Sequence, residues 1–330
     1  MAKGFPHRAG VATITPGIPT VTSLFTRGGN FLAMSGASDS GAGTKTNHDP
    51  AVQNTVMVNG TQTIGYREYG DSEGTPLIFL HGTPGSAILG EVFQDRARET
   101  GTRVIAIDRP GYGTSSPWPN RTLTDTGTFV TAVLDDIGAT EADMVGFSGG
   151  GPHALAVGTT HPDRVGDLHV VGGVAPPSLR ERTPAVQRTL SGLARRLPTL
   201  VKGVFRAQAW VADRASSSSF ILGQYTDGNQ DHIPDDVAEI VRRDFVTAFA
   251  THRSGAAHEL RMLSGSWATL LDGVDRPVHL WHGDNDTNVP VENARKVRDR
   301  LPDADLEVFE DADHLTALLL SRDPIFDRDQ

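Results

Sequence analysis

Residues 146–150 read Gly-Phe-Ser-Gly-Gly, which fits the pattern G-x-S-x-G. They lie where a short apolar run, Asp143–Phe147, meets a helical pattern over Gly150–Thr160. A sharp turn from strand to helix needs unusual backbone angles and close packing, which side chains larger than hydrogen would block. Such a turn lifts the serine hydroxyl clear of the sheet and aims the first helical amides at the same place. Ser148 is therefore the candidate nucleophile, and a glycine-rich helix start that only packs is the alternative.

Segments typical of strands and helices alternate on both sides of this turn. The predicted strands are Thr55–Val58, Thr63–Tyr69, Leu77–Leu80, Arg103–Asp108, Asp143–Phe147, Leu168–Val171, Val278–Trp281 and Leu306–Phe309. The predicted helices that alternate with them are Ala87–Glu99, Leu123–Ile137, Gly150–Thr160, Val291–Arg300 and Leu315–Leu320. Asn59-Gly60, between the first two strands, predicts a hairpin turn. The alternation predicts an α/β protein with a mostly parallel sheet and helices on both faces.

The alternation stops between about Pro177 and Trp267, where the pattern is helical only. One helix is predicted over Val237–Phe249, with Pro234 near its start. We therefore expect a core of residues 51–176 and 268–330, with residues 177–267 inserted as a helical cap on the sheet. Residues 1–50 are rich in Gly, Thr, Ser and Ala, and we expect them to be a disordered extension.

Composition excludes several classes of protein. The chain has 330 residues, a formal net charge of −10 and no cysteine. Disulfides, thiolate metal sites and cysteine nucleophiles are therefore impossible. A general nucleic-acid or anionic-membrane binder is expected to carry the opposite charge. The sequence contains no run of 18 or more apolar residues, so no transmembrane helix is predicted. We expect a cytoplasmic protein that acts on a small molecule and binds neither nucleic acid nor membrane.

A serine hydroxyl is a weak nucleophile at neutral pH and needs a base. His314 is the candidate, because it follows the last predicted strand, although it could merely begin the last helix. The base in turn needs a carboxylate to orient it. Asp286 lies in the loop after Val278–Trp281, and Asp284, nearer the strand end, is its competitor. No carboxylate directly follows the predicted strand Leu168–Val171.

Catalysis at a carbonyl also requires donors for the developing negative oxygen. The backbone N–H of Gly149 is the first candidate. Residues 81–86 read His-Gly-Thr-Pro-Gly-Ser and come directly after the strand Leu77–Leu80, so the N–H of Thr83 is the second candidate. The alternative is an ordinary turn rich in glycine and proline.

Taken together, these motifs resemble the α/β-hydrolase superfamily, and more narrowly its HGxPG-type serine hydrolases with a helical cap. The resemblance extends from about Thr55 to Arg322. It rests on residues 81–85, 108–115, 146–150, 283–286 and 313–314. It implies the α/β-hydrolase fold, the chain order Ser148, Asp286, His314 and no metal or organic cofactor. In that family the loop 108–115 is mainly structural, so Asp108 is not counted as catalytic.

The residues around Ser148 narrow the range of reactions that the resemblance implies. Related epoxide hydrolases and haloalkane dehalogenases place Asp where this chain has Ser148. Prolyl aminopeptidases usually have Trp after the serine, and carbon–carbon hydrolases and cofactor-free haloperoxidases often have Met. This chain has Gly149 there. The expected activity is hydrolysis of a carboxylic ester or lactone through an acyl-enzyme on Ser148.

Two other functions stay open at this point. An acyltransferase or thioesterase of a biosynthetic pathway could use the same residues, and some members of this fold are non-enzymatic small-molecule receptors. Aromatic residues of the expected cap suggest an apolar acyl or alcohol site. They are Phe205, Trp210, Phe220, Tyr225, Phe245 and Phe249. The sequence does not decide the oligomeric state.

Overall fold

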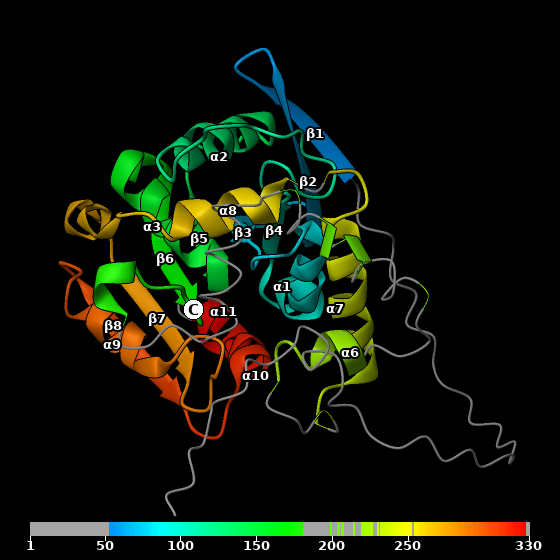
Figure 1. The fold of residues 1–330 in the computed structure, drawn as a ribbon. Helices are drawn as coiled ribbons and strands as arrows, with labels where there is room; N and C mark the ends of the chain where they lie inside the picture. Colours follow the sequence, from blue (N-terminus) through cyan, green and yellow to red (C-terminus); the bar gives the residue numbers. More distant parts are fainter. Residues whose placement is uncertain are drawn as a thin grey trace, which may run out of the picture. The chain divides into compact units, whose positions relative to one another are not determined.

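A computed structural model describes residues 53–180, 219–226, 232–252 and 254–327, together with a few isolated positions between 199 and 230 (Figure 1). The extension expected for residues 1–50 lies outside the described residues. So does most of the first half of the expected cap, including the aromatic residues Phe205 and Trp210.

The described strands form a single eight-stranded sheet in the order β1-β2-β4-β3-β5-β6-β7-β8. The strands are β1 Gln53–Val58, β2 Gln62–Gly70, β3 Thr75–Leu80, β4 Thr102–Ile107, β5 Ala142–Phe147, β6 Val165–Val171, β7 Val278–Gly283 and β8 Ala304–Phe309. Only the pairings β1–β2 and β2–β4 are antiparallel within this sheet. All eight predicted strands are therefore confirmed, and so is the mostly parallel sheet.

The predicted hairpin turn joins β1 and β2. Asn59 and Gly60 both have positive φ, 51° and 66°, and the N–H of Thr61 donates to the carbonyl of Val58 at 3.2 Å. Two consecutive positive φ values define the turn whose twist matches paired antiparallel strands. The Asn-Gly pair supplies them at little steric cost.

Helices cover both faces of the sheet (Figure 1). They are α1 Gln94–Thr100, α2 Asp125–Asp136, α3 Gly151–Thr160, α9 Val291–Arg298, α10 His314–Leu320 and α11 Arg322–Asp327. Alternate residues of β3 belong to different cores: Leu77 and Phe79 to one, Ile78 and Leu80 to the other. Side chains of a strand alternate between faces, so each face of the sheet has its own apolar core.

The helix predicted at Ala87–Glu99 is present, but its first half is a 3₁₀ helix. Residues Ala87–Phe93 form a 3₁₀ helix, η2, and the α-helical part begins only at Gln94. Six of the seven residues of η2 are buried, because the segment lies between the sheet and the helix α7, Asp235–Ala248. A Cβ on Gly90 would lie 2.5 Å from that of Ala106 in β4, so the backbone itself rests on the sheet. Burial on nearly every side removes the periodicity from which helix type and bounds are inferred.

Within the described part of residues 177–267, all regular structure is helical. The longer elements are α6 Ser219–Leu222, α7 Asp235–Ala248 and α8 Gly255–Leu263. The structure confirms the helix expected at Val237–Phe249, which begins directly after Pro234. The assignment of this block as a separate cap stays a prediction. No helix among the described residues is long and apolar enough to cross a membrane.

Candidate active site

The turn after β5 has the strained geometry that its sequence predicts. Ser148 has φ of 53°, a left-handed conformation that is uncommon for a residue with a side chain. A Cβ on Gly146 would lie 2.7 Å from the carbonyl oxygen of Gly150, and one on Gly150 would lie 2.0 Å from that of Leu80. Ser148 itself is partly exposed at the end of the strand. Backbone strain of this kind persists where the surroundings enforce it, commonly at functional sites.

His314 and Asp286 form a buried pair. His314 Nδ1 lies 2.6 Å from Asp286 Oδ2, and the other carboxylate oxygen accepts the N–H groups of Asn288 and Val289 at 2.9 and 2.8 Å. Burial by itself raises the pKa of Asp286, but the adjacent His314 and these hydrogen bonds hold it below its usual value. The ionised carboxylate therefore accepts a hydrogen bond from Nδ1–H, which leaves Nε2 as the unprotonated nitrogen. The competitor Asp284 is exposed.

Aromatic rings place His314 beside the serine turn. The imidazole centroid lies 4.8 Å from the ring of Phe147, the residue before Ser148, and 6.4 Å from the ring of Tyr225. A Cβ on Gly172 would lie 2.9 Å from His314 Cε1, so only glycine leaves room for the imidazole there. Among the hydrogen bonds of the described residues, none joins Ser148 to His314. Such bonds are often long in unliganded enzymes and shorten when substrate binds.

Tyr225 attaches the segment after α6 to this site. Its hydroxyl donates to the carbonyl of Pro84 at 3.3 Å, and its own carbonyl accepts the N–H of Leu315 at 3.3 Å. One residue from the expected cap therefore contacts both the turn after β3, through its side chain, and the start of α10, through its backbone. Of the other aromatic residues suggested for a substrate pocket, Phe245 and Phe249 are buried in a hydrophobic core, where they pack rather than line a cavity.

The turn after β3 lies directly against the serine turn. A Cβ on Gly149 would be 2.2 Å from Thr83 Oγ1 and 3.3 Å from Thr83 N, and one on Gly82 would be 3.5 Å from the Cβ of Ser148. The structure thus brings together the two amides that sequence analysis selects as oxyanion donors. Both turns stand at the carboxyl ends of parallel strands, where open α/β sheets bind their ligands.

A buried glutamate that sequence analysis missed contacts the turn after β3. Glu259 of α8 is completely buried and accepts the Thr83 hydroxyl at 2.7 Å and the Tyr112 hydroxyl at 3.0 Å. One signal could have found it. Glu259 shares the spacing of the buried helix residues Ala256 and Leu263, so it occupies the apolar face of an amphipathic helix.

Two arginines form salt bridges with this glutamate. Arg109 donates to it twice, at 2.8 and 2.7 Å, and Arg121 once, at 2.9 Å. Burial by itself raises the pKa of Glu259, but Arg109 beside it holds the pKa well below the usual value. His153 Nε2 lies 3.3 Å away, and burial lowers the pKa of that histidine to about 4, so it stays neutral at physiological pH. The loop 108–115, expected to be structural, thus anchors the turn that carries Thr83.

A second buried carboxylate anchors the same turn from α7. Asp244 Oδ1 accepts the N–H of Ser86 at 2.6 Å and its hydroxyl at 2.8 Å. Burial raises the pKa of Asp244 to about 7 despite these two hydrogen bonds, and the charge of Asp108 adds to the shift. The folded protein therefore binds a proton here over a pH range in which an unfolded aspartate is already ionised.

This shift predicts a pH-dependent stability. Because the pKa of Asp244 is higher in the folded state, its contribution is complete below about pH 4 and is lost as the pH rises through 7. We expect the free energy of unfolding of the wild type, relative to Asp244→Asn, to fall by about 3 kcal/mol from pH 5 to pH 8. Urea unfolding at several pH values measures the difference. The exposed Asp236→Asn on the same helix serves as control, and parallel profiles for wild type and Asp244→Asn would contradict the assignment.

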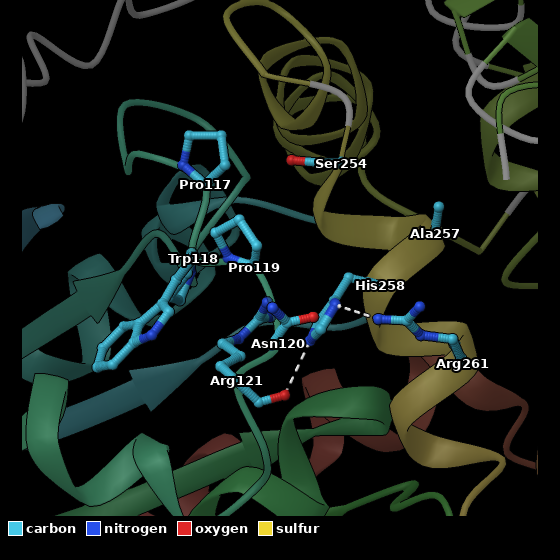
Figure 2. Close-up of a pocket in the computed structure, with 10 residues that line it drawn as sticks. Pro117, Trp118, Pro119, Asn120, Arg121, Ser254, Ala257, His258 and Arg261 are labelled. Carbon is cyan, nitrogen blue, oxygen red and sulfur yellow. Dashed lines mark hydrogen bonds between the residues drawn. The ribbon is translucent and has the colours of Figure 1, made fainter.

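A pocket of about 260 Å³ lies between residues 110–121 and α8 (Figure 2). It is lined by Pro110, Pro117, Trp118, Pro119, Asn120, Arg121, Ser254, Ala257, His258 and Arg261. His258 Nε2 lies 3.0 Å from the carbonyl oxygen of Arg121, so it donates there, and its Nδ1 accepts from Arg261 at 3.3 Å (Figure 2). None of the residues expected to be catalytic lines this pocket, so it is separate from the candidate active site.

The parallel sheet, the strained serine turn and the buried His–Asp pair define the class of protein to which this chain belongs. A sequence profile described as the alpha/beta hydrolase fold matches residues 75–319, more than half of the chain. The chain belongs to the α/β-hydrolase fold family. Among the described residues, no group of His, Asp and Glu side chains could hold a metal ion.

Similar proteins include several enzymes of this fold. The non-heme chloroperoxidase CPO-A1 of Kitasatospora aureofaciens is 26% identical over 81% of this chain and 94% of its own length. A 2-hydroxy-6-oxononadienedioate/2-hydroxy-6-oxononatrienedioate hydrolase of Paraburkholderia phymatum is 27% identical over 77% and 85%. The solved esterase of Exiguobacterium antarcticum superposes with a TM-score of 0.63 at 20% identity, covering 83% of this chain and 97% of that one. These similarities support a hydrolase of this fold.

Proposed function

We propose that this protein is a serine hydrolase that cleaves a carboxylic ester or lactone through an acyl-enzyme on Ser148. The observation that carries the proposal is the buried pair of His314 and Asp286, whose imidazole packs on the residue before a strained, partly exposed serine. A buried carboxylate of this kind is poorly explained by stability alone, because removing its charge from water costs free energy.

The reaction begins when Ser148 Oγ attacks the substrate carbonyl and His314 Nε2 takes the hydroxyl proton. Asp286 accepts a hydrogen bond from Nδ1–H of His314, which keeps the imidazole in the required tautomer and stabilises the imidazolium. The N–H groups of Gly149 and Thr83 donate to the oxyanion of the tetrahedral intermediate. His314 then gives its proton to the leaving alcohol.

Hydrolysis of the acyl-enzyme repeats these steps with water in place of the serine hydroxyl. His314 removes a proton from water, the resulting oxygen attacks the acyl carbonyl, and the proton returns to Ser148 as the acid leaves. No metal or organic cofactor takes part in this scheme. The partly exposed ring of Tyr225 beside His314 supports an apolar acyl or alcohol group on the substrate.

The test is turnover of p-nitrophenyl esters of increasing acyl length, together with labelling of the intact protein by a fluorophosphonate. We expect many turnovers per enzyme molecule and a label that mass spectrometry places on the peptide containing Ser148. Labelling without turnover would indicate a different substrate class or an acyl acceptor other than water. The absence of both turnover and labelling would contradict the proposal and favour a non-enzymatic receptor.

A further inference from the structure

We infer that Glu259 is a positioning residue, which holds the Thr83 amide at the oxyanion site through the Thr83 hydroxyl. This inference rests on the proposed function. Thr83 Oγ1 donates to Glu259 Oε2 at 2.7 Å, and the carboxylate that accepts this bond is completely buried. In such surroundings a hydrogen bond to a charged group is stronger than one exposed to water.

The bond is part of a closed set of contacts around the turn. Arg109 Nη2 donates to Thr83 Oγ1 and to the carbonyl of Gly82, both at 3.1 Å, while the same guanidinium is held by Glu259. Arg109 also donates to the carbonyl of His81. Three consecutive residues of the turn are therefore fixed by one glutamate–arginine pair. The backbone N–H of Thr83 cannot move without breaking at least one of these contacts.

The turn after β3 contacts the turn at Ser148, so the position of Thr83 affects both proposed oxyanion donors. Thr83 Oγ1 occupies the space that a side chain on Gly149 would need, so the Thr83 hydroxyl lies between Glu259 and the serine turn. The hydroxyl thus lies beside Gly149, the other donor of the proposed oxyanion site. A displacement of about 1 Å at such a donor reduces catalysis by about a hundredfold.

The charge of Glu259 supports a role beyond packing. A buried carboxylate with two arginines is no more stable than well-packed apolar residues of the same volume, and it is often less stable. Arg121 donates to Oε1 of Glu259, whereas Thr83 donates to Oε2. Among the described residues, Arg121 makes no hydrogen bond with the turn. The contacts that Glu259 and Arg109 make with residues 81–83 distinguish this cluster from an ion pair that only joins α8 to the sheet.

Thr83→Val and Thr83→Ser test the inference as a matched pair. Valine keeps the shape and the backbone N–H but lacks the hydroxyl, whereas serine keeps the hydroxyl. We expect Thr83→Val to lower kcat about a hundredfold with KM changed less than about threefold, and to weaken binding of a trifluoromethyl ketone in the same proportion. Thr83→Ser keeps the hydroxyl that reaches Glu259, so its loss of kcat is expected to be at least about tenfold smaller than that of Thr83→Val.

Glu259→Gln extends the test, because its effect on kcat should largely disappear in the Thr83→Val background if Glu259 acts through that hydroxyl. Should Glu259→Gln fail to fold, the Thr83 pair still decides. Wild-type kcat in Thr83→Val, or equal losses in both Thr83 variants, would overturn the inference while the proposed function stands. If the wild type labels at Ser148 without turnover, the labelling rates of the two variants replace kcat. If it does neither, the proposed function fails and the inference fails with it.

Discussion

Ser148→Ala is expected to lower kcat for ester hydrolysis about a million-fold and to abolish fluorophosphonate labelling. The alanine variant has no oxygen at the end of β5 to form the acyl-enzyme. It keeps the oxyanion donors and the substrate site, so KM should change little and only slow attack by water should remain. The rate is measured with the p-nitrophenyl ester that the wild type hydrolyses best, after exhaustive purification to exclude wild-type contamination.

Two measurements separate this effect from a loss of structure. Alanine suits the left-handed conformation of residue 148 no better than serine does, so the melting temperature should stay close to that of the wild type. Ser266→Ala is the matched control, because Ser266 is exposed and far from the strand ends in sequence. If Ser148→Ala retained more than about a tenth of wild-type kcat, Ser148 would not be the nucleophile.

Asp286→Asn is expected to lower kcat about ten-thousand-fold. Asp286 Oδ1 accepts two backbone N–H groups, from Asn288 and Val289, so the amide oxygen of an asparagine must take that place. The amide nitrogen then faces His314 Nδ1 and donates to it. This forces the imidazole proton onto Nε2, where it blocks transfer from Ser148.

Asp284→Asn is the control for this variant. Asp284 lies two residues earlier in the same loop but is exposed, so its kcat should equal that of the wild type. The comparison decides between the two carboxylates that the sequence places after β7. An equal loss in both variants would indicate general damage to the loop, and a loss confined to Asp284→Asn would reverse the assignment.

Local sequence patterns were sufficient to predict the strands and the turn at Ser148. Alternation of apolar residues, or their unbroken run, follows directly from the geometry of a strand. Asn59-Gly60 reports backbone angles that few other residues adopt, and the glycines around Ser148 report close packing that a Cβ would block. All eight strands of the sheet were predictable for this reason. The chain order of Ser148, Asp286 and His314 follows from the order of the strand ends that carry them.

Other features depend on which distant segments meet. The choice of Asp286 over Asp284 rests on burial, which the folding of the loop onto α10 decides. Glu259 was missed because its partners Arg109 and Thr83 lie 150 and 176 residues away in the chain. The helix type of η2 was not predictable because the segment is buried between the sheet and α7, so its apolar residues show no periodicity. Periodicity reports only which face of a segment is apolar, so pairing between buried charges, and the environment that sets their pKa values, emerge only when the segments pack.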